Sequence, residues 1–199
     1  LPDRIADLLL RPSRPPLEAR VVFSALDADV ALEIEQAFAR AGAVVVTNTR
    51  VHRMDPDVPL LVPEVNARHV DLIDVQRRER GWPGAILANP NCSTAARVVA
   101  LAPLHAAFRL ERLFVSTMQA ASGAGYPGVP SLDLLGNVIP FIGGEEEKME
   151  IETRKILDAT DLRMSAHCNR VPVVDGHLEV VSAAFTRPPS VDEAIAAFT

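Results

Sequence analysis

The sequence contains few cysteines and no cysteine pair. Its two cysteines are Cys92 and Cys168, and no CxxC spacing occurs. This pattern excludes a disulfide-stapled scaffold and argues against a cysteine-rich zinc site. We therefore expect a protein without a structural metal that works in the reducing cytoplasm.

Long hydrophobic runs and clusters of positive charge are also lacking. No apolar run approaches the roughly 20 residues that a membrane helix needs, and we see no signal-peptide pattern at the start. The net charge is −6 and the Lys and Arg residues are scattered, which gives no support to nucleic-acid binding. With 48% hydrophobic and 23% charged residues, the composition is that of a globular protein without nucleic-acid or membrane partners.

Apolar strands alternate with amphipathic helices in the first half of the chain. The strands are apolar throughout, which indicates a parallel sheet with helices on both faces, and hence a Rossmann-like α/β domain. We expect a loop and one short helix over 1–20. The predicted strands cover 21–26, 43–48, 60–66 and 84–89, and the predicted helices cover 27–42 and 67–81.

Ligands of such sheets bind at the carboxyl ends of the strands. Four short segments follow predicted strands and should lie on one rim: "FSAL", "VTN", "EVN" and "NPNC". We therefore expect the ligand site along this rim.

The second half of the chain has a different pattern. A long strand over 109–122 leads to a Gly-rich loop, and helical segments interrupted by Pro140 follow. Strands over 162–174 and 177–187 flank Asp175-Gly176, a strong hairpin signal. We expect an α+β domain with an antiparallel sheet, and we place the domain boundary at Cys92, which gives domains 1–91 and 92–199.

Cys92 stands at a junction between a strand and a helix. Asn89-Pro90 ends the strand, and Ser93-Thr94 is typical of a helix start. A free cysteine is ordinarily a small buried hydrophobe. At a helix N-terminus, however, free N–H groups favour a thiolate and could bind an oxyanion, so this position indicates a nucleophile.

Several other residues could serve chemistry beside Cys92. His177 follows a turn and could face a cleft as an acid/base, whereas a satisfied structural histidine is the alternative. Gln119 precedes a loop of small residues, which let backbone approach a ligand closely. Glu145 and Lys148 share one helical face, although a solvated charge run is the ordinary reading. Arg170 lies among apolar neighbours and needs an anionic partner, either structural or substrate.

Six segments together resemble the aspartate-semialdehyde dehydrogenase family, in its archaeal and fungal-type branch. They are "VFSAL", "HRMDPDVPLLVPEVN", "RGWPGAILANPNCST", "TMQAASGAGYPGVPS", "NVIPFIGGEEEKME" and "CNRVPVVDGH". The resemblance implies an NADP-dependent enzyme, with NAD as the alternative cofactor. Such an enzyme interconverts L-aspartyl 4-phosphate and L-aspartate 4-semialdehyde through a cysteine thioester, in lysine, threonine and methionine biosynthesis. It also implies phosphate as a ligand and a homodimer or homotetramer.

The resemblance extends to individual positions. It implies a nucleophile at Cys92, an acid/base at His177 and an orienting amide at Gln119. The residues that it implies for substrate and phosphate are Arg170, Glu145, Lys148, Arg53 and Asn91. Those expected at the cofactor are Ser24, Ala25, Ser122, Gly123 and Gly125.

The family pattern also contains a GxxGxxG turn before the part that matches Leu1 and a Gly/Ala-rich helix after the part that matches Thr199. We therefore expect a chain truncated at both ends. Three alternatives stay open. One is a related acyl reductase of the malonyl-CoA reductase type, another is a cysteine hydrolase that uses Cys92 and His177 without a cofactor, and the last is an inactive fragment that only dimerises.

Overall fold

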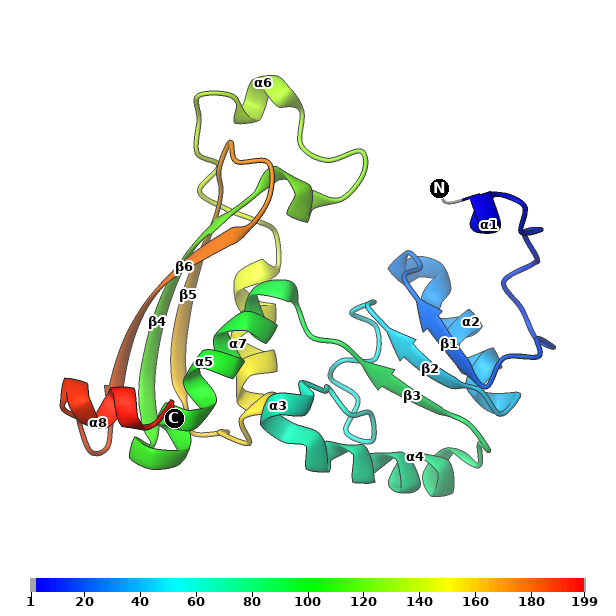
Figure 1. Cartoon of the computed structure of the whole chain (residues 1–199), viewed down its shortest axis with the longest axis horizontal. Helices are drawn as coiled ribbons and strands as arrows, with labels where there is room; N and C mark the ends of the chain where they lie inside the picture. The colour runs from blue at the N-terminus through cyan, green and yellow to red at the C-terminus, as the bar shows by residue number, and fades with distance from the viewer. Residues whose placement is uncertain (1–2, 199) are drawn as a thin grey trace. The chain divides into compact units, whose positions relative to one another are not determined.

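The computed structural model describes residues 3–198, which form two compact units (Figure 1). Of the described residues, unit 1 contains 3–59 and 70–89, and unit 2 contains 60–69 and 90–198. The segment 60–69 therefore belongs with the second half of the chain, which one cut at Cys92 does not anticipate. Within the described range, no helix has both the length and the apolar character to cross a membrane.

Unit 1 is built on a parallel sheet of three strands in the order β1-β2-β3. The strands are β1 (Val21–Ser24), β2 (Val44–Thr47) and β3 (Ala85–Ala88). The N–H of Asn48 donates to the Ser24 carbonyl, and the N–H of Asn89 donates to the Thr47 carbonyl. The Asn89 amide also donates to Asn48 Oδ1 at 2.7 Å. The predicted rim therefore forms at the ends of these three strands.

Helices cover this sheet as the apolar strands predict. Helix α2 (Ala28–Arg40) packs against all three strands, and α4 (Leu72–Arg80) packs against β3. Gly81 ends α4 with φ 65°, a left-handed conformation that glycine adopts at little cost. The short helix expected near the start is α1 (Asp3–Ala6). The 3-10 turn η1 (Ala67–Asp71) precedes α4.

The strand predicted over 60–66 is wrong. Pro63–Asn66 is a short helix, α3, with the proline in its first turn. A proline has no N–H to donate and its fixed φ suits that position. The Asn66 side chain accepts from Val62 N–H at 2.8 Å and donates to the Leu60 carbonyl at 2.9 Å. These local bonds satisfy the backbone without a sheet, so "EVN" lies outside the rim of unit 1.

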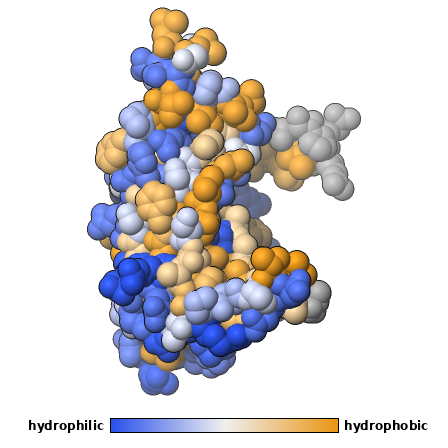
Figure 2. Space-filling model, turned by 90° about the vertical axis from the view of Figure 1, so that its left-hand side faces the viewer, coloured by the Kyte–Doolittle hydropathy of each residue, from blue (hydrophilic) through white to orange (hydrophobic). Residues whose placement is uncertain are grey.

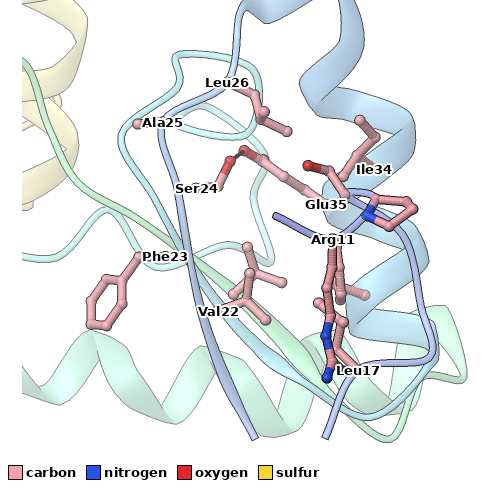
Figure 3. Close-up of a pocket in the computed structure, with 13 residues that line it drawn as sticks. Arg11, Leu17, Val22, Phe23, Ser24, Ala25, Leu26, Ile34 and Glu35 are labelled. Carbon is pink, nitrogen blue, oxygen red and sulfur yellow. Dashed lines mark hydrogen bonds between the residues drawn. The ribbon is translucent and has the colours of Figure 1, made fainter. Parts of the chain in front are cut away.

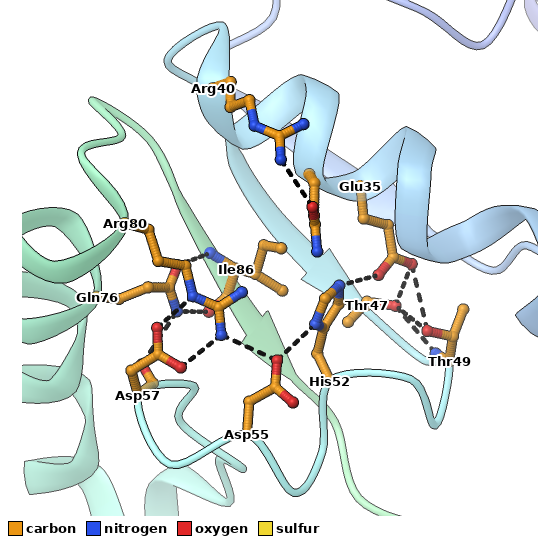
Figure 4. A network of polar contacts seen from close by, with 11 residues as sticks. Glu35, Arg40, Thr47, Thr49, His52, Asp55, Asp57, Gln76, Arg80 and Ile86 are labelled. Carbon is orange, nitrogen blue, oxygen red and sulfur yellow. Dashed lines mark hydrogen bonds and ion pairs between the residues drawn. The ribbon is translucent and has the colours of Figure 1, made fainter.

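Glu35 places a carboxylate inside unit 1, on the sheet side of α2. Its side chain is 1% exposed. Oε1 accepts a hydrogen bond from Ser24 Oγ at 2.5 Å. It accepts a second from Thr47 Oγ1 at 2.6 Å, which Figure 4 shows. A buried carboxylate is costly unless its oxygens are paired. Two hydroxyls at strand ends therefore make this helix position tolerable, and they fix α2 to β1 and β2.

The polar contacts that begin at Glu35 continue into the loop after β2. His52 Nε2 lies 3.8 Å from Glu35 Oε2, and His52 Nδ1 lies 2.8 Å from Asp55 Oδ2. Arg80 Nη2 of α4 donates to Asp55 Oδ2 at 2.9 Å, and Arg80 also binds Asp57 (Figure 4). Burial alone would raise the pKa of Asp55, but the hydrogen bonds from His52 and Arg80 lower it overall. These contacts hold the loop after β2 to α2 through His52 and to α4 through Arg80.

Unit 2 is built on a sheet of three strands in the order β5-β4-β6. Its strands are β4 (Leu110–Gln119), β5 (Arg163–Arg170) and β6 (His177–Phe185). Strand β4 runs parallel to β5 and antiparallel to β6. The α/β and α+β fold class is confirmed, although only one of the two strand pairings in unit 2 is antiparallel.

Helices cover one face of the unit 2 sheet. Helix α5 (Cys92–Phe108) packs against β6, and α7 (Glu145–Ile156) packs against β5 and against α5 (Figure 1). Between helices and sheet lies an apolar core that includes Leu101, Leu113, Val115, Met149 and Leu162. The shorter elements of unit 2 are η2 (Ala121–Ala124), α6 (Ser131–Leu134) and α8 (Val191–Ala196).

The predicted hairpin at Asp175-Gly176 is wrong. Strand β4 lies between β5 and β6, so the two strands flanking this turn are not neighbours. The connecting segment instead passes the end of β4, where Ala121 N–H donates to the Val173 carbonyl and Ser122 N–H to the Val174 carbonyl. A turn signal fixes the local backbone, whereas the long strand β4 decides which strands pair.

We predict that Glu35→Ala lowers the free energy of unfolding of unit 1 by about 3 kcal/mol, because two buried hydroxyls lose their acceptor and His52 loses a neighbouring carboxylate. Glu33→Ala is the matched control, since Glu33 lies on the same helix and is exposed. Urea denaturation of both variants measures the difference. Equal stability of the two variants would contradict a structural role for Glu35.

Candidate functional site

Cys92 is the first residue of α5, as the sequence predicts. Asn91 is the N-cap, and its Oδ1 accepts from Ser93 N–H at 3.0 Å and from Thr94 N–H at 3.4 Å. The Cys92 thiol is free and exposed. A reactive group can therefore reach it at the positive end of the helix dipole.

Asn91 also ties the start of α5 to α7. Its N–H donates to Glu152 Oε2 at 2.7 Å. Its side-chain amide donates to both carboxylate oxygens of Glu145, at 2.8 and 2.9 Å. The residue is buried, and its amide oxygen and nitrogen both have partners within the protein. Asn91 therefore fixes where the backbone of Cys92 lies.

Three of the expected site residues lie side by side across the unit 2 sheet. Gln119 is the register partner of Arg170 on β5 and of His177 on β6. Register partners on neighbouring strands point to the same face. Gln119 and Arg170 are buried, at 2% and 5% exposure, and His177 is half-buried. The sheet thus gathers an amide, a guanidinium and an imidazole in one row on its helix-covered face.

The backbone of Ala120 links two members of this row. Its carbonyl accepts from Arg170 Nη1 at 2.8 Å, and its N–H donates to His177 Nδ1 at 3.1 Å. Gly123 packs directly on both side chains. A Cβ at Gly123 would lie 2.8 Å from His177 Cε1 and 2.9 Å from Arg170 Nη1, so a larger residue would displace one of these side chains. The small residues of the loop are needed for this close approach.

A pocket of about 410 Å³ lies beside the row. Gly123 and Arg170 line it together with Glu145 and Lys148 of α7, and its apolar lining includes Ile139 and Phe141. Lys148 Nζ is 3.5 Å from Glu145 Oε1, as their spacing on one helical face predicts. Two cations and one carboxylate suit a small zwitterionic or anionic ligand.

The structure also distinguishes the three successive glutamates of "EEEK". Glu145 is buried and lines the pocket, Glu146 Oε1 accepts from Cys168 N–H at 3.0 Å, and Glu147 is exposed. Only Glu145 and Lys148 of this segment line the pocket within the part of the chain that the structure describes. Cys92 and His177 are not among the described lining residues.

Sequence reasoning missed one buried ion pair in unit 2. Arg97 of α5 donates to Glu179 Oε2 of β6 at 2.9 Å and to Thr153 Oγ1 of α7 at 2.9 Å. It joins the helix that begins at Cys92 to the strand that begins at His177. The available signal was a lone arginine in an otherwise apolar helix, which needs a buried partner.

The remaining expected residues are divided between the units. Ser122, Gly123 and Gly125 lie in or next to η2 of unit 2. In unit 1, Arg53 Nη2 donates to the Asn48 carbonyl at 2.8 Å, and Ser24 Oγ is bound to Glu35.

Ala25 lines a pocket of unit 1 that follows β1 past its carboxyl end (Figure 3). Its volume is about 180 Å³, and Arg11, Leu17 and Phe38 are among the lining residues. This volume is below the roughly 300–1,000 Å³ typical of pockets for whole small molecules. The pocket can therefore hold only a portion of a dinucleotide.

Two family models match the chain. A model described as the NAD binding domain of semialdehyde dehydrogenase matches residues 4–73. A model described as the semialdehyde dehydrogenase dimerisation domain matches residues 101–199. Together the two matches include most of both units.

The similar proteins and solved structures described next are aspartate-semialdehyde dehydrogenases. The aspartate-semialdehyde dehydrogenases of Archaeoglobus fulgidus and Schizosaccharomyces pombe are 50% and 48% identical to the chain, over 100% and 98% of it and 60% of each relative. The crystal structure of the Candida albicans enzyme with NADP has a TM-score of 0.88 at 41% identity, covering 99% of this chain and 61% of that one. For aspartate semialdehyde dehydrogenase II of Vibrio cholerae complexed with ASA, the TM-score is 0.79 at 32% identity, covering 89% and 59%.

The chain thus spans about 60% of the length of the curated relatives that it matches. Over that length the two domain models, the relatives and the solved structures agree. The chain belongs to the aspartate-semialdehyde dehydrogenase family.

Proposed function

We propose that the protein is an NADP-dependent aspartate-semialdehyde dehydrogenase that interconverts L-aspartyl 4-phosphate and L-aspartate 4-semialdehyde through a thioester on Cys92. The observation that carries this proposal is the row of Arg170, Gln119 and His177. It lies beside a pocket that is lined by two cationic side chains, Arg170 and Lys148, and by the carboxylate of Glu145. The family supports the proposal, and its members supply lysine, threonine and methionine biosynthesis. The cytoplasmic location expected from the sequence stays a prediction.

The pocket residues match the charges of the proposed substrate. Arg170 presents a planar fork to the α-carboxylate, which a guanidinium binds through two parallel hydrogen bonds. Glu145 is the carboxylate for the substrate amine, and Lys148 supplies a second positive charge for phosphate. A substrate without an amine, such as that of the malonyl-CoA reductase type, would leave Glu145 without this use.

Cys92 attacks the aldehyde carbon and forms a thiohemiacetal at the positive end of the α5 dipole, which favours the oxygen that becomes negative. Asn91 holds the start of α5 in place through Glu145 and Glu152, so we propose a positioning role for it. Gln119 orients the bound acyl group from the centre of the row. Phosphate then cleaves the thioester, and Arg53 is the proposed phosphate ligand in unit 1.

The proposed cofactor contacts come from both units. Ala25 and the pocket beside β1 offer an arginine and an apolar lining, which suit a phosphate and an aromatic ring. Ser24 contributes through its backbone, since its hydroxyl is bound to Glu35. Ser122, Gly123 and Gly125 are the proposed contacts in unit 2. When bound, NADP accepts the hydride that the thiohemiacetal loses.

The other face of the unit 2 sheet suits a second copy of the protein. Phe114 and Met118 of β4 and Leu178 and Val180 of β6 are 44–54% exposed on this face. Figure 2, which looks at this side, shows a band of hydrophobic residues flanked by hydrophilic ones. The matching model describes this part of the family as a dimerisation domain. We propose a homodimer through this face, and a homotetramer stays a prediction.

We predict that Cys92→Ala lowers the rate of aldehyde oxidation by about 1,000-fold or more, because covalent catalysis needs the thiolate. The fold should persist, since Asn91 still caps α5. Cys168→Ala is the matched control: burial raises the pKa of the Cys168 thiol to about 11, so it is not a nucleophile near neutral pH. Cys92→Ala with a tenth or more of the original rate would refute the thioester.

Arg170→Lys should raise KM for aspartate semialdehyde about tenfold or more and leave KM for NADP within about twofold. Lysine keeps the charge but loses the fork, whose charged hydrogen bonds contribute about 1.5–3 kcal/mol. Arg163→Lys, an exposed position on the same strand, serves as the control in steady-state kinetics. A parallel rise of both constants would assign Arg170 to folding instead.

Introducing charge on the apolar face should separate the dimer. We expect Phe114→Glu combined with Val180→Glu to give a monomer in size-exclusion chromatography with light scattering, because the interface would bury two unpaired carboxylates. Val191→Glu on α8 changes an exposed apolar residue outside this face and should leave the dimer intact. A dimer that survives the double substitution places the interface elsewhere.

A further inference from the structure

His52 is a buried histidine in the loop after β2 that has no role in the proposed mechanism. It is 1% exposed, and it directly precedes Arg53, the proposed phosphate ligand. At that burial the imidazole cannot contact a phosphate ion from solution, whereas Arg53 is only half-buried. Any contribution of His52 to phosphate binding must therefore act through another residue.

The ring of His52 lies between two carboxylates of unit 1 (Figure 4). Its Nδ1 lies 2.8 Å from Asp55 Oδ2, and a carboxylate oxygen accepts, so Nδ1 carries the proton of this hydrogen bond. Its Nε2 faces Glu35 Oε2 of α2 at 3.8 Å. Asp55 is bound in turn by Arg80 of α4 at 2.9 Å. His52 and Asp55 thus attach the loop to two helices.

The hydrogen bond between His52 and Asp55 closes the turn that contains Arg53. The Asp55 N–H donates to the His52 carbonyl at 3.2 Å, so the same two residues are joined through their backbones as well as their side chains. A second turn overlaps this one, because the Arg53 N–H donates to the Arg50 carbonyl at 3.3 Å. A turn closed in this way leaves the backbone of Arg53 little freedom.

The side chain of Arg53 lies at the rim of the parallel sheet. Its Nη2 donates to the Asn48 carbonyl at 2.8 Å, and Asn48 directly follows β2. Asn48 Oδ1 in turn accepts from the amide of Asn89, which directly follows β3, at 2.7 Å. Ligands of parallel sheets bind at this edge. The guanidinium of Arg53 is therefore directed to the edge where an anion would bind.

We propose that His52 is a positioning residue for Arg53, and that it raises the affinity for phosphate without touching the ion. An anion that binds a mobile arginine must order that side chain and its loop, and a turn that is closed beforehand avoids this entropic cost. A guanidinium gains most from such preorganisation, because its two parallel hydrogen bonds require one orientation. The hydrogen bond to Asp55 carries the effect, since it closes the turn. This inference rests on the proposed function, in which phosphate bound by Arg53 cleaves the thioester.

Titration with inorganic phosphate tests the inference without turnover. In nitrogen-15-labelled wild-type protein, phosphate should shift the side-chain Nε–H signal of Arg53, which is assigned by its loss in Arg53→Lys. We expect His52→Leu to weaken this binding about tenfold or more, the effect of losing one charged hydrogen bond. His69→Leu is the matched control, since His69 Nε2 also faces an aspartate, Asp158, at 3.2 Å, and it should bind phosphate as the wild type does. Unchanged binding in His52→Leu would overturn the proposal, and so would an Arg53 signal that phosphate does not move in the wild type.

Two amide variants distinguish positioning from folding. The amide of His52→Asn takes the place of Nδ1 and donates to Asp55, whereas the longer side chain of His52→Gln takes the place of Nε2 and donates toward Glu35. We expect His52→Asn to bind phosphate within about threefold of the wild type and His52→Gln to bind it about tenfold more weakly. Urea denaturation compares the stability of the two variants. Equal phosphate affinities would overturn the proposal, and this comparison decides it even if His52→Leu does not fold.

Steady-state kinetics provide the functional arm. In the oxidation of aspartate semialdehyde, His52→Gln should raise KM for phosphate about tenfold and leave kcat and KM for the semialdehyde within about twofold. Comparable changes in all three constants would indicate general damage to unit 1 and would overturn the positioning role. If the wild type binds phosphate at Arg53 but does not oxidise the semialdehyde, the proposed function fails, and the binding comparison still decides the role of His52.

Discussion

The hydrogen bonds of Asn91 are the interaction on which the candidate site of unit 2 depends. One side chain caps α5 and binds the Glu145 carboxylate, and the backbone N–H of the same residue binds Glu152. The backbone of Cys92, the start of α5 and the pocket-lining face of α7 are thereby fixed relative to one another. Arg97 adds a second connection, from α5 to the strand that begins at His177. The exposed thiol of Cys92 is positioned because Asn91, the residue before it, is buried and hydrogen-bonded through both its backbone N–H and its side chain.

In both units, buried charged side chains bind polar groups of neighbouring elements. In unit 1, Glu35 binds the hydroxyls at the ends of β1 and β2, and Arg80 binds the carboxylates of the following loop. In unit 2, Arg97 of α5 binds Thr153 of α7, and Glu145 of α7 binds the side chain of Asn91 at the start of α5. Such groups add little net stability compared with apolar packing. They specify which loop and which helix end lies at each strand end, and that is what a site on a sheet edge requires.

Features governed by local chemistry could be predicted from the sequence. Asn-Pro followed by Asn-Cys-Ser predicted the start of α5, Gly81 predicted the end of α4, and the apolar strands predicted a parallel sheet. The failures involve choices made by distant partners. "LLVPEVN" is as apolar as a strand, but Asn66 satisfies the local backbone instead. Asp175 does lie in a bend, and Gly176 has a φ of 88°, yet β4 separates the strands on either side of them.

For the site, residue types and spacing indicated Cys92, Arg170, Gln119 and His177, and the registers of β4 explain why three of them share a row. The partners of Arg97 could not be named from the sequence, because Glu179 and Thr153 look like ordinary strand and helix residues there. The hydrogen bond from the Ala120 N–H to His177 Nδ1 could not be predicted either, because it depends on where the segment between β4 and η2 lies relative to β6.

The central claim is that Cys92 carries the acyl group while the row of Arg170, Gln119 and His177 holds it. Mass spectrometry after mixing the protein with aspartate semialdehyde and NADP in the absence of phosphate tests it most directly. The account predicts an aspartyl thioester on the peptide that contains Cys92, which disappears when phosphate is added, and an unmodified Cys168. An unmodified Cys92 in protein that reduces NADP under these conditions, or an acyl group at another residue, would contradict it.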